Sequence, residues 1–178
     1  MIAKTIANVP NVLTILRFVF SPVFFYFFMS GKTELGLVVF MFVAVTDLAD
    51  GWIAREYKAT TGFGKAIDPM ADKFMIFFGI WSIISMFDFP LWALPLYILR
   101  DFVSLGGSLL VHIKHRGIWK PNTLGKLTTG FQVATIISYI IDVQLKFALL
   151  IITLILSILT SITYIGRIVK IFKGTYKE

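Results

Sequence analysis

Residues 47–73 read DLADGWIAREYKATTGFGKAIDPMADK, and they hold four aspartates and one glutamate, five of the chain's ten acidic residues. We expect two helices here, because long apolar stretches lie on both sides of a short polar segment that contains glycine. Asp47 and Asp50 then share one face of the first helix, and Asp68 and Asp72 share one face of the second. A short loop makes the two helices antiparallel neighbours, so this stretch predicts that the four carboxylates converge.

The composition places these helices in a membrane. Of the 178 residues, 57% are hydrophobic and 15% are charged, which is unlike an ordinary soluble domain. One helical crossing of a bilayer needs about 20 apolar residues. The chain offers six such stretches, at residues 12–29, 35–53, 66–87, 91–111, 124–141 and 147–171. They leave almost no room for a soluble domain, so the sequence predicts an all-α, multi-pass integral membrane protein, with residues 1–178 as a single domain of six transmembrane helices.

The basic residues predict the orientation of the chain in the membrane. If the loops alternate sides, one side receives Lys4, Arg17, Arg55, Lys58, Lys65, Lys114, Arg116, Lys120, Lys126, Arg167, Lys170, Lys173 and Lys177. The other side receives little beyond Lys32 and Lys146. The positive-inside rule then puts both termini and the aspartate-bearing loop on the cytoplasmic side. Because the net charge of +7 is spread over the ends of the spans, we expect membrane lipids and no nucleic acid as partners.

The four aspartates favour a site for divalent metal ions. A charged side chain at the centre of a bilayer costs about 2.5–3.5 kcal/mol, and carboxylates held together also repel one another. Arg55 and Lys73 would offset two of the charges. Hard oxygen ligands favour Mg²⁺ or Mn²⁺, and the chain has no cysteine to bind softer metals. Acidic residues at helix ends are usually solvated interface residues, but two matched stripes favour a site with two metal ions, which suits phosphoryl chemistry.

These residues resemble the signature of a known family. The chain carries Asp47, Asp50, Gly51, Ala54, Arg55, Gly64, Asp68 and Asp72 at the spacing of the CDP-alcohol phosphatidyltransferases, and the close match covers residues 9–73. The resemblance implies six transmembrane helices, usually a homodimer, and an active site open to the cytoplasmic membrane surface. Members of this family transfer a phosphatidyl-type group from a CDP-linked lipid to an alcohol and release CMP.

The resemblance also implies roles for individual residues. Asp47, Asp50 and Asp68 would ligate the first metal ion, and Asp68 and Asp72 would ligate the second. Asp72 would in addition be the general base that takes the proton of the acceptor hydroxyl. The residues expected to bind the nucleotide and the CDP-lipid are Asn11, Gly51, Ala54, Arg55, Thr61 and Gly64. The implied partners are therefore CDP-diacylglycerol and a small polar alcohol.

The opening segment bears on the acceptor alcohol. Residues 9–17, VPNVLTILR, are similar to the opening of phosphatidylglycerophosphate synthases and of eukaryotic-type cardiolipin synthases. This similarity favours sn-glycerol 3-phosphate, whose phosphate would need basic residues away from the carboxylates. The candidates are Arg17, Arg100, Arg116 and Lys126. Arg116 and Lys126 have a plain alternative as loop charges of the cytoplasmic side, and Arg100 has one as an ion pair with Asp101.

Other functions stay open from the sequence. Relatives that use glycerol phosphate commonly carry Arg-Glu near the fourth helix and a further arginine two turns later, whereas this chain has Arg100-Asp101 and then Ser108. The difference leaves room for phosphatidylglycerol as acceptor, as in cardiolipin synthesis, or for another reaction of the family. A cation transporter would also use intramembrane carboxylates, but it has no need of a diphosphate pocket. The complete motif argues against a catalytically silent assembly protein.

Overall fold

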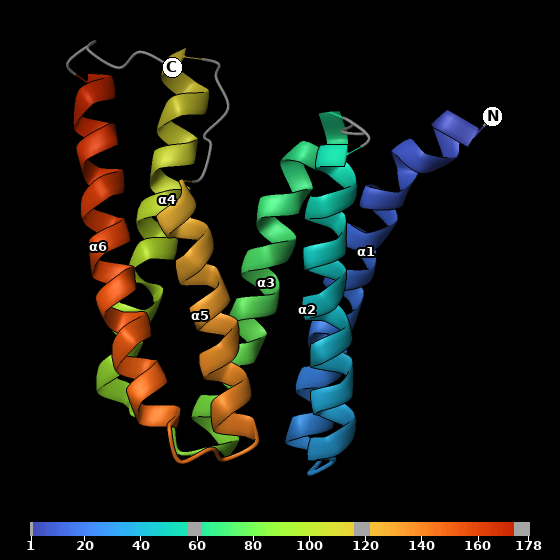
Figure 1. Cartoon of the computed structure of the whole chain (residues 1–178), viewed down its shortest axis with the longest axis vertical. Coiled ribbons are helices and arrows are strands. Elements are labelled where there is room, and N and C mark those ends of the chain that lie inside the picture. Colours follow the sequence, from blue (N-terminus) through green and yellow to red (C-terminus); the bar gives the residue numbers. More distant parts are fainter. Residues whose placement is uncertain (1, 57–61, 116–121, 173–178) are drawn as a thin grey trace. The chain divides into compact units, whose positions relative to one another are not determined.

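The computed structural model describes the backbone of residues 2–56, 62–115 and 122–172, and the side chains of residues 12–46, 73–108, 110 and 122–170. Six α-helices and one 3₁₀ turn lie in this part of the chain (Figure 1). They are α1 (Ile2–Met29), α2 (Thr33–Glu56), α3 (Gly62–Met86), η1 (Leu91–Ala93), α4 (Leu94–His115), α5 (Thr123–Ile140) and α6 (Lys146–Phe172). The predicted all-α class is therefore confirmed, with a helix at each expected place.

The helix bounds differ from the predicted spans by a few residues at several ends, and most of all at the start of α1. α1 begins at Ile2, well before residue 12, because hydropathy marks the part of a helix that suits lipid and not the end of its hydrogen-bonded backbone. The fourth span begins with the 3₁₀ turn η1. In this turn the N–H of Ala93 donates a hydrogen bond to the carbonyl of Pro90 at 2.9 Å. By length and hydropathy, Val12–Met29 and Lys146–Lys170 qualify as membrane spans among the described residues.

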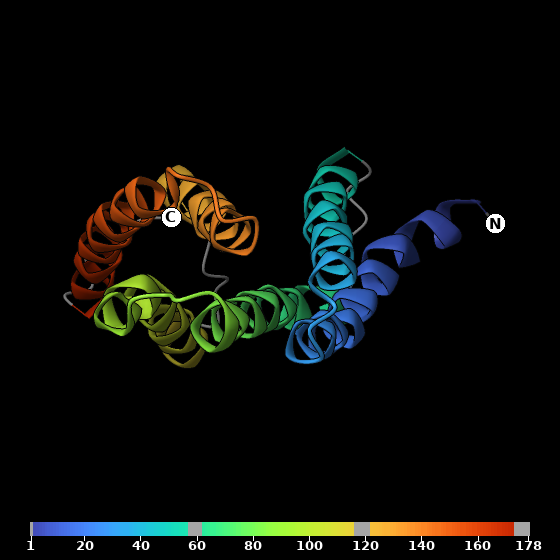
Figure 2. The same ribbon diagram turned by 90° about the horizontal axis from the view of Figure 1, so that it is seen from below.

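Residues 1–89, together with residues 139–141, form one compact unit. Within it α2 and α3 both pack against α1. α2 runs in the opposite direction to α3 (Figures 1 and 2). The interior of the unit is aromatic: Phe24 meets Phe40 edge to face with 5.1 Å between ring centroids, and Phe28 meets Phe87 in the same way at 5.7 Å. Such pairs stabilise a core beyond the apolar area that they bury. These contacts fix α1 against α2 and against the end of α3.

A glycine allows the close approach of α1 and α2. A Cβ atom at Gly36 would lie 2.6 Å from two ring atoms of Phe28, which is far inside normal contact distance. The Phe28 ring is fully buried and is in edge-to-face contact with Phe24 and Phe87, so it has no room to turn away. The residue at position 36 therefore has to lack a side chain.

We expect Gly36→Ala to lower the free energy of unfolding by about 1–3 kcal/mol, the usual cost of overpacking a core. Gly130→Ala is the matched control, because nothing lies within 4 Å of a Cβ at Gly130, which is also helical. The control change is expected to be neutral or slightly stabilising, since alanine favours helix over glycine. Thermal unfolding of the two purified variants in detergent measures the difference, and equal midpoints would contradict the prediction.

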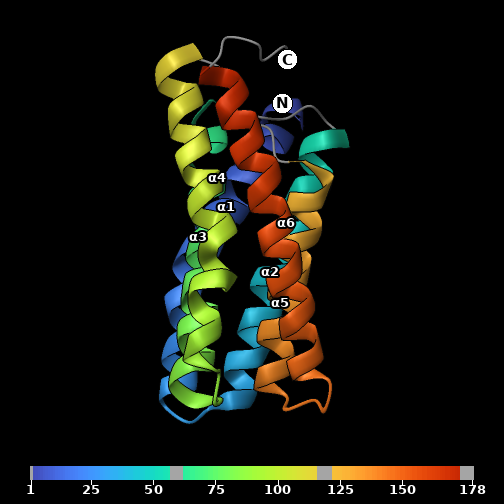
Figure 3. The same ribbon diagram turned by 90° about the vertical axis from the view of Figure 1, so that its left-hand side faces the viewer.

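Residues 90–138 and 142–178 form the second compact unit. α4 and α6 pack side by side in it (Figure 3), and α5 joins α6 through pairs of hydroxyl groups. Thr128 and Thr160 are hydrogen-bonded at 2.8 Å, and so are Thr135 and Thr153. The partners are spaced by seven residues on each of two antiparallel helices, so the pairs fall on one seam. Buried hydroxyl groups need such partners in lipid, where water is absent.

Candidate functional site

The acidic motif lies on two continuous helices of the first unit. Asp47 and Asp50 belong to α2, and Asp68 and Asp72 belong to α3. At 100° per residue, the members of each pair stand within about 60° of one another around the helix axis. The spacing read from the sequence therefore does correspond to one face of each helix. The side chains of these four residues lie outside the described side chains, so their convergence stays a prediction.

The backbone brings the two halves of the motif to one end of the unit. α2 and α3 are in contact and antiparallel, so the last turns of α2 and the first turns of α3 lie at the same end of the unit (Figures 1 and 3). Gly51, Ala54 and Arg55 belong to those last turns of α2, while Gly64 belongs to the first turn of α3. Residues of both helices are therefore at the same end of the unit, which a site for one bridging ligand would require.

The chemistry of the donor set fits hard divalent ions. Asp47, Asp50, Asp68 and Asp72 would offer carboxylate oxygens alone, which are the ligands that Mg²⁺ and Mn²⁺ prefer. Among the residues whose side chains the structure describes, no group of three or more His, Cys, Asp or Glu comes together. The four aspartates are not in that part of the chain. The predicted ion site therefore rests on their helical placement and their chemistry.

Two other predicted site residues, Thr61 and Arg116, lie outside the described residues. Asn11 belongs to α1, but its side chain is not among those described. Arg17, also on α1, is buried, with 1% of its surface exposed. An interior position was the expected one for a charged residue within a span, where such residues face the bundle. The roles of these residues in binding stay predictions.

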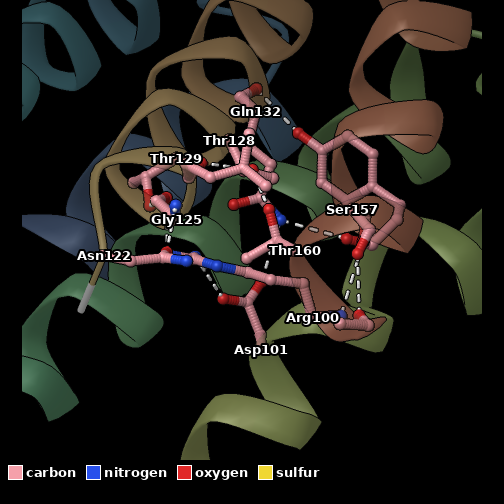
Figure 4. Close-up of polar contacts among 12 residues, drawn as sticks. Arg100, Asp101, Asn122, Gly125, Thr128, Thr129, Gln132, Ser157 and Thr160 are labelled. Carbon is pink, nitrogen blue, oxygen red and sulfur yellow. Dashed lines mark hydrogen bonds and ion pairs between the residues drawn. The ribbon is translucent and has the colours of Figure 1, made fainter. Parts of the chain in front are cut away.

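The remaining two basic candidates are both in the second unit and differ in their surroundings. Lys126 is exposed near the start of α5. Arg100 is buried on α4: its Nη1 donates to Oδ1 of Asp101 at 2.8 Å, and its Nη2 donates to the carbonyl of Gly125 at 2.7 Å (Figure 4). The ion pair that the sequence left open is thus present, and it neutralises the guanidinium inside the unit.

A buried glutamine completes this cluster, and the sequence reading did not single it out. The side chain of Gln132 donates from Nε2 to Oδ2 of Asp101 at 2.9 Å and to the carbonyl of Tyr97 at 3.0 Å. The hydroxyl of Tyr97 in turn donates to the carbonyl of Gln132 at 2.7 Å. The available signal was a lone amide side chain inside the apolar stretch 124–141, where an unpaired polar group is costly.

Comparisons with known proteins agree with the motif. The sequence profile of the CDP-alcohol phosphatidyltransferase family matches residues 7–159. A CDP-diacylglycerol–glycerol-3-phosphate 3-phosphatidyltransferase of Aquifex aeolicus is 31% identical, over 96% of this chain and 99% of its own length. A probable phosphatidylglycerophosphate synthase of Mycobacterium tuberculosis is 31% identical over 95% of this chain and 85% of its own length. A probable CMP-forming cardiolipin synthase of Drosophila melanogaster is 32% identical over 75% of this chain and 47% of its own length.

Proposed function

The chain belongs to the CDP-alcohol phosphatidyltransferase family, and on that premise we propose that it transfers a phosphatidyl group from CDP-diacylglycerol to sn-glycerol 3-phosphate. The products would be phosphatidylglycerol phosphate and CMP. Members of this enzyme family are integral membrane proteins and generally use divalent metal ions. The observation that carries the proposal is the complete acidic motif. Two of its aspartates share one face of α2, the other two share one face of α3, and these helices are antiparallel and in contact.

The donor would bind at the ends of α2 and α3. The four aspartates would hold the metal ions, which supply charge that neutralises a diphosphate and stabilises the attacking and leaving oxygens. Arg55 would add charge-assisted hydrogen bonds to the diphosphate. Gly51 and Gly64 would let the nucleotide approach the backbone closely. The residues proposed to lie around the nucleotide are completed by Asn11, Ala54 and Thr61.

Asp72 would act on the acceptor. Its carboxylate would take the proton of the attacking hydroxyl, whose oxygen then bonds to the phosphorus that carries the diacylglycerol. The bond from that phosphorus to the oxygen bridging to CMP breaks, and CMP leaves with the electron pair. An aspartate is a weak base at its ordinary pKa, so its placement beside the hydroxyl has to supply most of its effect.

Lys126 is the most suitable residue to hold the phosphate of the acceptor. Its ammonium is exposed, whereas the guanidinium of Arg100 is paired with Asp101. Arg17 and Arg116 complete the proposed acceptor set. The names of the Aquifex and Mycobacterium relatives, which match nearly the whole chain, support glycerol 3-phosphate as the acceptor. The name of the Drosophila relative supports a second candidate, transfer to phosphatidylglycerol to make cardiolipin.

The topology and the assembly are part of the same proposal. The distribution of lysine and arginine supports six crossings with both termini and the active site on the cytoplasmic side. A donor lipid in the inner leaflet would then present its soluble headgroup to the motif while its acyl chains stay in the bilayer. We also propose a homodimer, on the ground of the family resemblance.

Release of CMP by the purified protein tests the proposed reaction. With CDP-diacylglycerol and Mg²⁺, we expect turnover with sn-glycerol 3-phosphate and little with phosphatidylglycerol, inositol phosphate or serine. A chelator is expected to abolish turnover, and added Mg²⁺ or Mn²⁺ to restore it, because both ions suit carboxylate ligands. Turnover with phosphatidylglycerol alone would favour cardiolipin synthesis. Turnover that is indifferent to chelator would contradict the metal site.

A further inference from the structure

Three helices of the second unit meet at Gly125 in the first turn of α5. The carbonyl of Asn122 accepts the N–H of Lys126 at 3.2 Å, and its Oδ1 accepts the N–H of Gly125 at 2.7 Å, so Asn122 caps α5. A Cβ at Gly125 would overlap the hydroxyl of Tyr164 on α6 and would lie 3.2 Å from the ring carbon that carries it. The start of α5 is therefore held close against α6.

Arg100 ties the same turn to α4. Its Nη2 donates to the carbonyl of Gly125, directly before Lys126 in the chain, and its Nη1 donates to Asp101. Gln132 completes the series by donating to the other oxygen of Asp101 (Figure 4). A continuous path of hydrogen bonds thus runs from Gln132 through Asp101 and Arg100 to the backbone beside Lys126.

The whole path is buried: exposure is 0% for Gln132, 6% for Arg100 and 8% for Asp101. In an environment of low dielectric constant these contacts are strong, and they hold their geometry without competition from water. The carboxylate of Asp101 already neutralises the guanidinium of Arg100. Arg100 therefore serves better as a fixed support for the turn than as a free charge for an anionic ligand.

We propose that Gln132 is a positioning residue for the acceptor. By fixing Asp101 and Arg100, it would hold the first turn of α5, and with it the backbone from which the exposed side chain of Lys126 would reach the phosphate of the acceptor. The inference rests on the proposed function, because it takes Lys126 as a ligand of glycerol 3-phosphate. A charged group that is already in place loses less entropy when its ligand binds, so this support improves binding of the acceptor.

Loss of the Gln132 side-chain amide would act on the acceptor and not on the donor. Without the donor atom Nε2, Asp101 loses one hydrogen bond, so its carboxylate is held less firmly and the hold of Arg100 on Gly125 loosens. The aspartate motif that would bind CDP-diacylglycerol belongs to α2 and α3 and takes no part in this path. The acceptor KM should therefore rise while the donor KM and kcat stay close to those of the parent.

The test uses the full chain in detergent, with steady-state kinetics for CDP-diacylglycerol and glycerol 3-phosphate. Gln132→Met fills nearly the same volume but donates no hydrogen bond to Asp101. We expect it to raise the acceptor KM by about 5- to 10-fold, which is less than the full effect of losing one hydrogen bond to a charged group. Gln132→Asn, whose amide is shorter by one methylene, is the second variant if Gln132→Met does not fold. It should shift the same constant in the same direction.

Thr135→Val is the matched control on the same helix. It removes a buried hydrogen bond to Thr153 that has no connection with Arg100, so it should lower the unfolding temperature and leave both KM values unchanged. An unchanged acceptor KM in the Gln132 variants overturns the inference. An equal rise of the acceptor KM in Thr135→Val overturns it as well, because a general loss of stability would then explain the effect.

Lys126→Met separates this inference from the proposed function. If it raises the acceptor KM and Gln132→Met adds little to that rise in the double variant, Gln132 acts through Lys126, which supports the inference. If Lys126→Met raises the acceptor KM and Gln132→Met does not, the positioning role alone fails. If Lys126→Met leaves the acceptor KM unchanged, the assignment of Lys126 to the acceptor fails, and the inference fails with it.

Discussion

Asp72→Asn is expected to abolish turnover while leaving the binding of CDP-diacylglycerol largely intact. Asparagine has the size of aspartate, but its amide does not accept the proton of the attacking hydroxyl. A positioned general base contributes about 10²–10⁴-fold to the rate, and the loss of a proposed metal ligand adds to that. CMP release measures turnover, and binding of the radiolabelled donor to the purified variant measures the retained affinity.

Asp88→Asn makes the same chemical change at an exposed aspartate outside the motif. Asp88 has φ of 52°, a backbone conformation that asparagine also adopts readily, so the control should fold and turn over like the parent. Normal turnover by Asp72→Asn would refute its role as the base. Loss of donor binding together with turnover would instead assign Asp72 to the metal site alone.

Asp101→Asn is expected to give the largest loss of stability, about 3–5 kcal/mol in the free energy of unfolding. The substitution removes the charge that balances the buried guanidinium of Arg100, to which Asp101 accepts a hydrogen bond at 2.8 Å. In place of the carboxylate oxygen that accepts from Gln132, the asparagine presents either its NH₂ group or its amide oxygen. Thermal or denaturant unfolding in detergent measures the effect.

Two further variants show whether burial of the pair is the cause. Asp142→Asn breaks an ion pair with Lys146 that is largely exposed, and it should cost no more than about 1 kcal/mol. In the double variant Arg100→Leu/Asp101→Leu no buried charge is left unpaired, so it should recover much of the stability lost in Asp101→Asn. Similar losses in Asp101→Asn and Asp142→Asn would show that burial of the pair is not decisive.

Much of the fold follows from local properties of the sequence. Lipid requires a run of apolar residues for each crossing and a helix to satisfy the backbone, so six apolar stretches predicted six helices. The same reasoning placed the start of α1 wrongly, because a helix continues past the apolar part of its sequence. The grouping of Asp47 with Asp50 and of Asp68 with Asp72 depends only on helical period, and both pairs do lie on continuous helices.

The second unit shows what local patterns do not contain. Arg100 had two readings in the sequence, as an acceptor ligand and as a partner of Asp101, and both are compatible with its position in the chain. Gln132 is 31 residues from Asp101 and 35 from Tyr97, and no spacing rule connects them. The hydroxyl pairs between α5 and α6 likewise depend on the register of two packed helices.

The sequence by itself determined the helices, their apolar stretches and the acidic signature of the family, because each depends on residues within a few turns of one another. Only the tertiary structure decided that α2 and α3 both pack against α1, that Gly36 has to receive the ring of Phe28, and that Arg100 is held between Asp101 and Gly125. These features arise from contacts between distant segments. Packing and the need to pair every buried polar group select such contacts, and neither requirement is visible in a single helix.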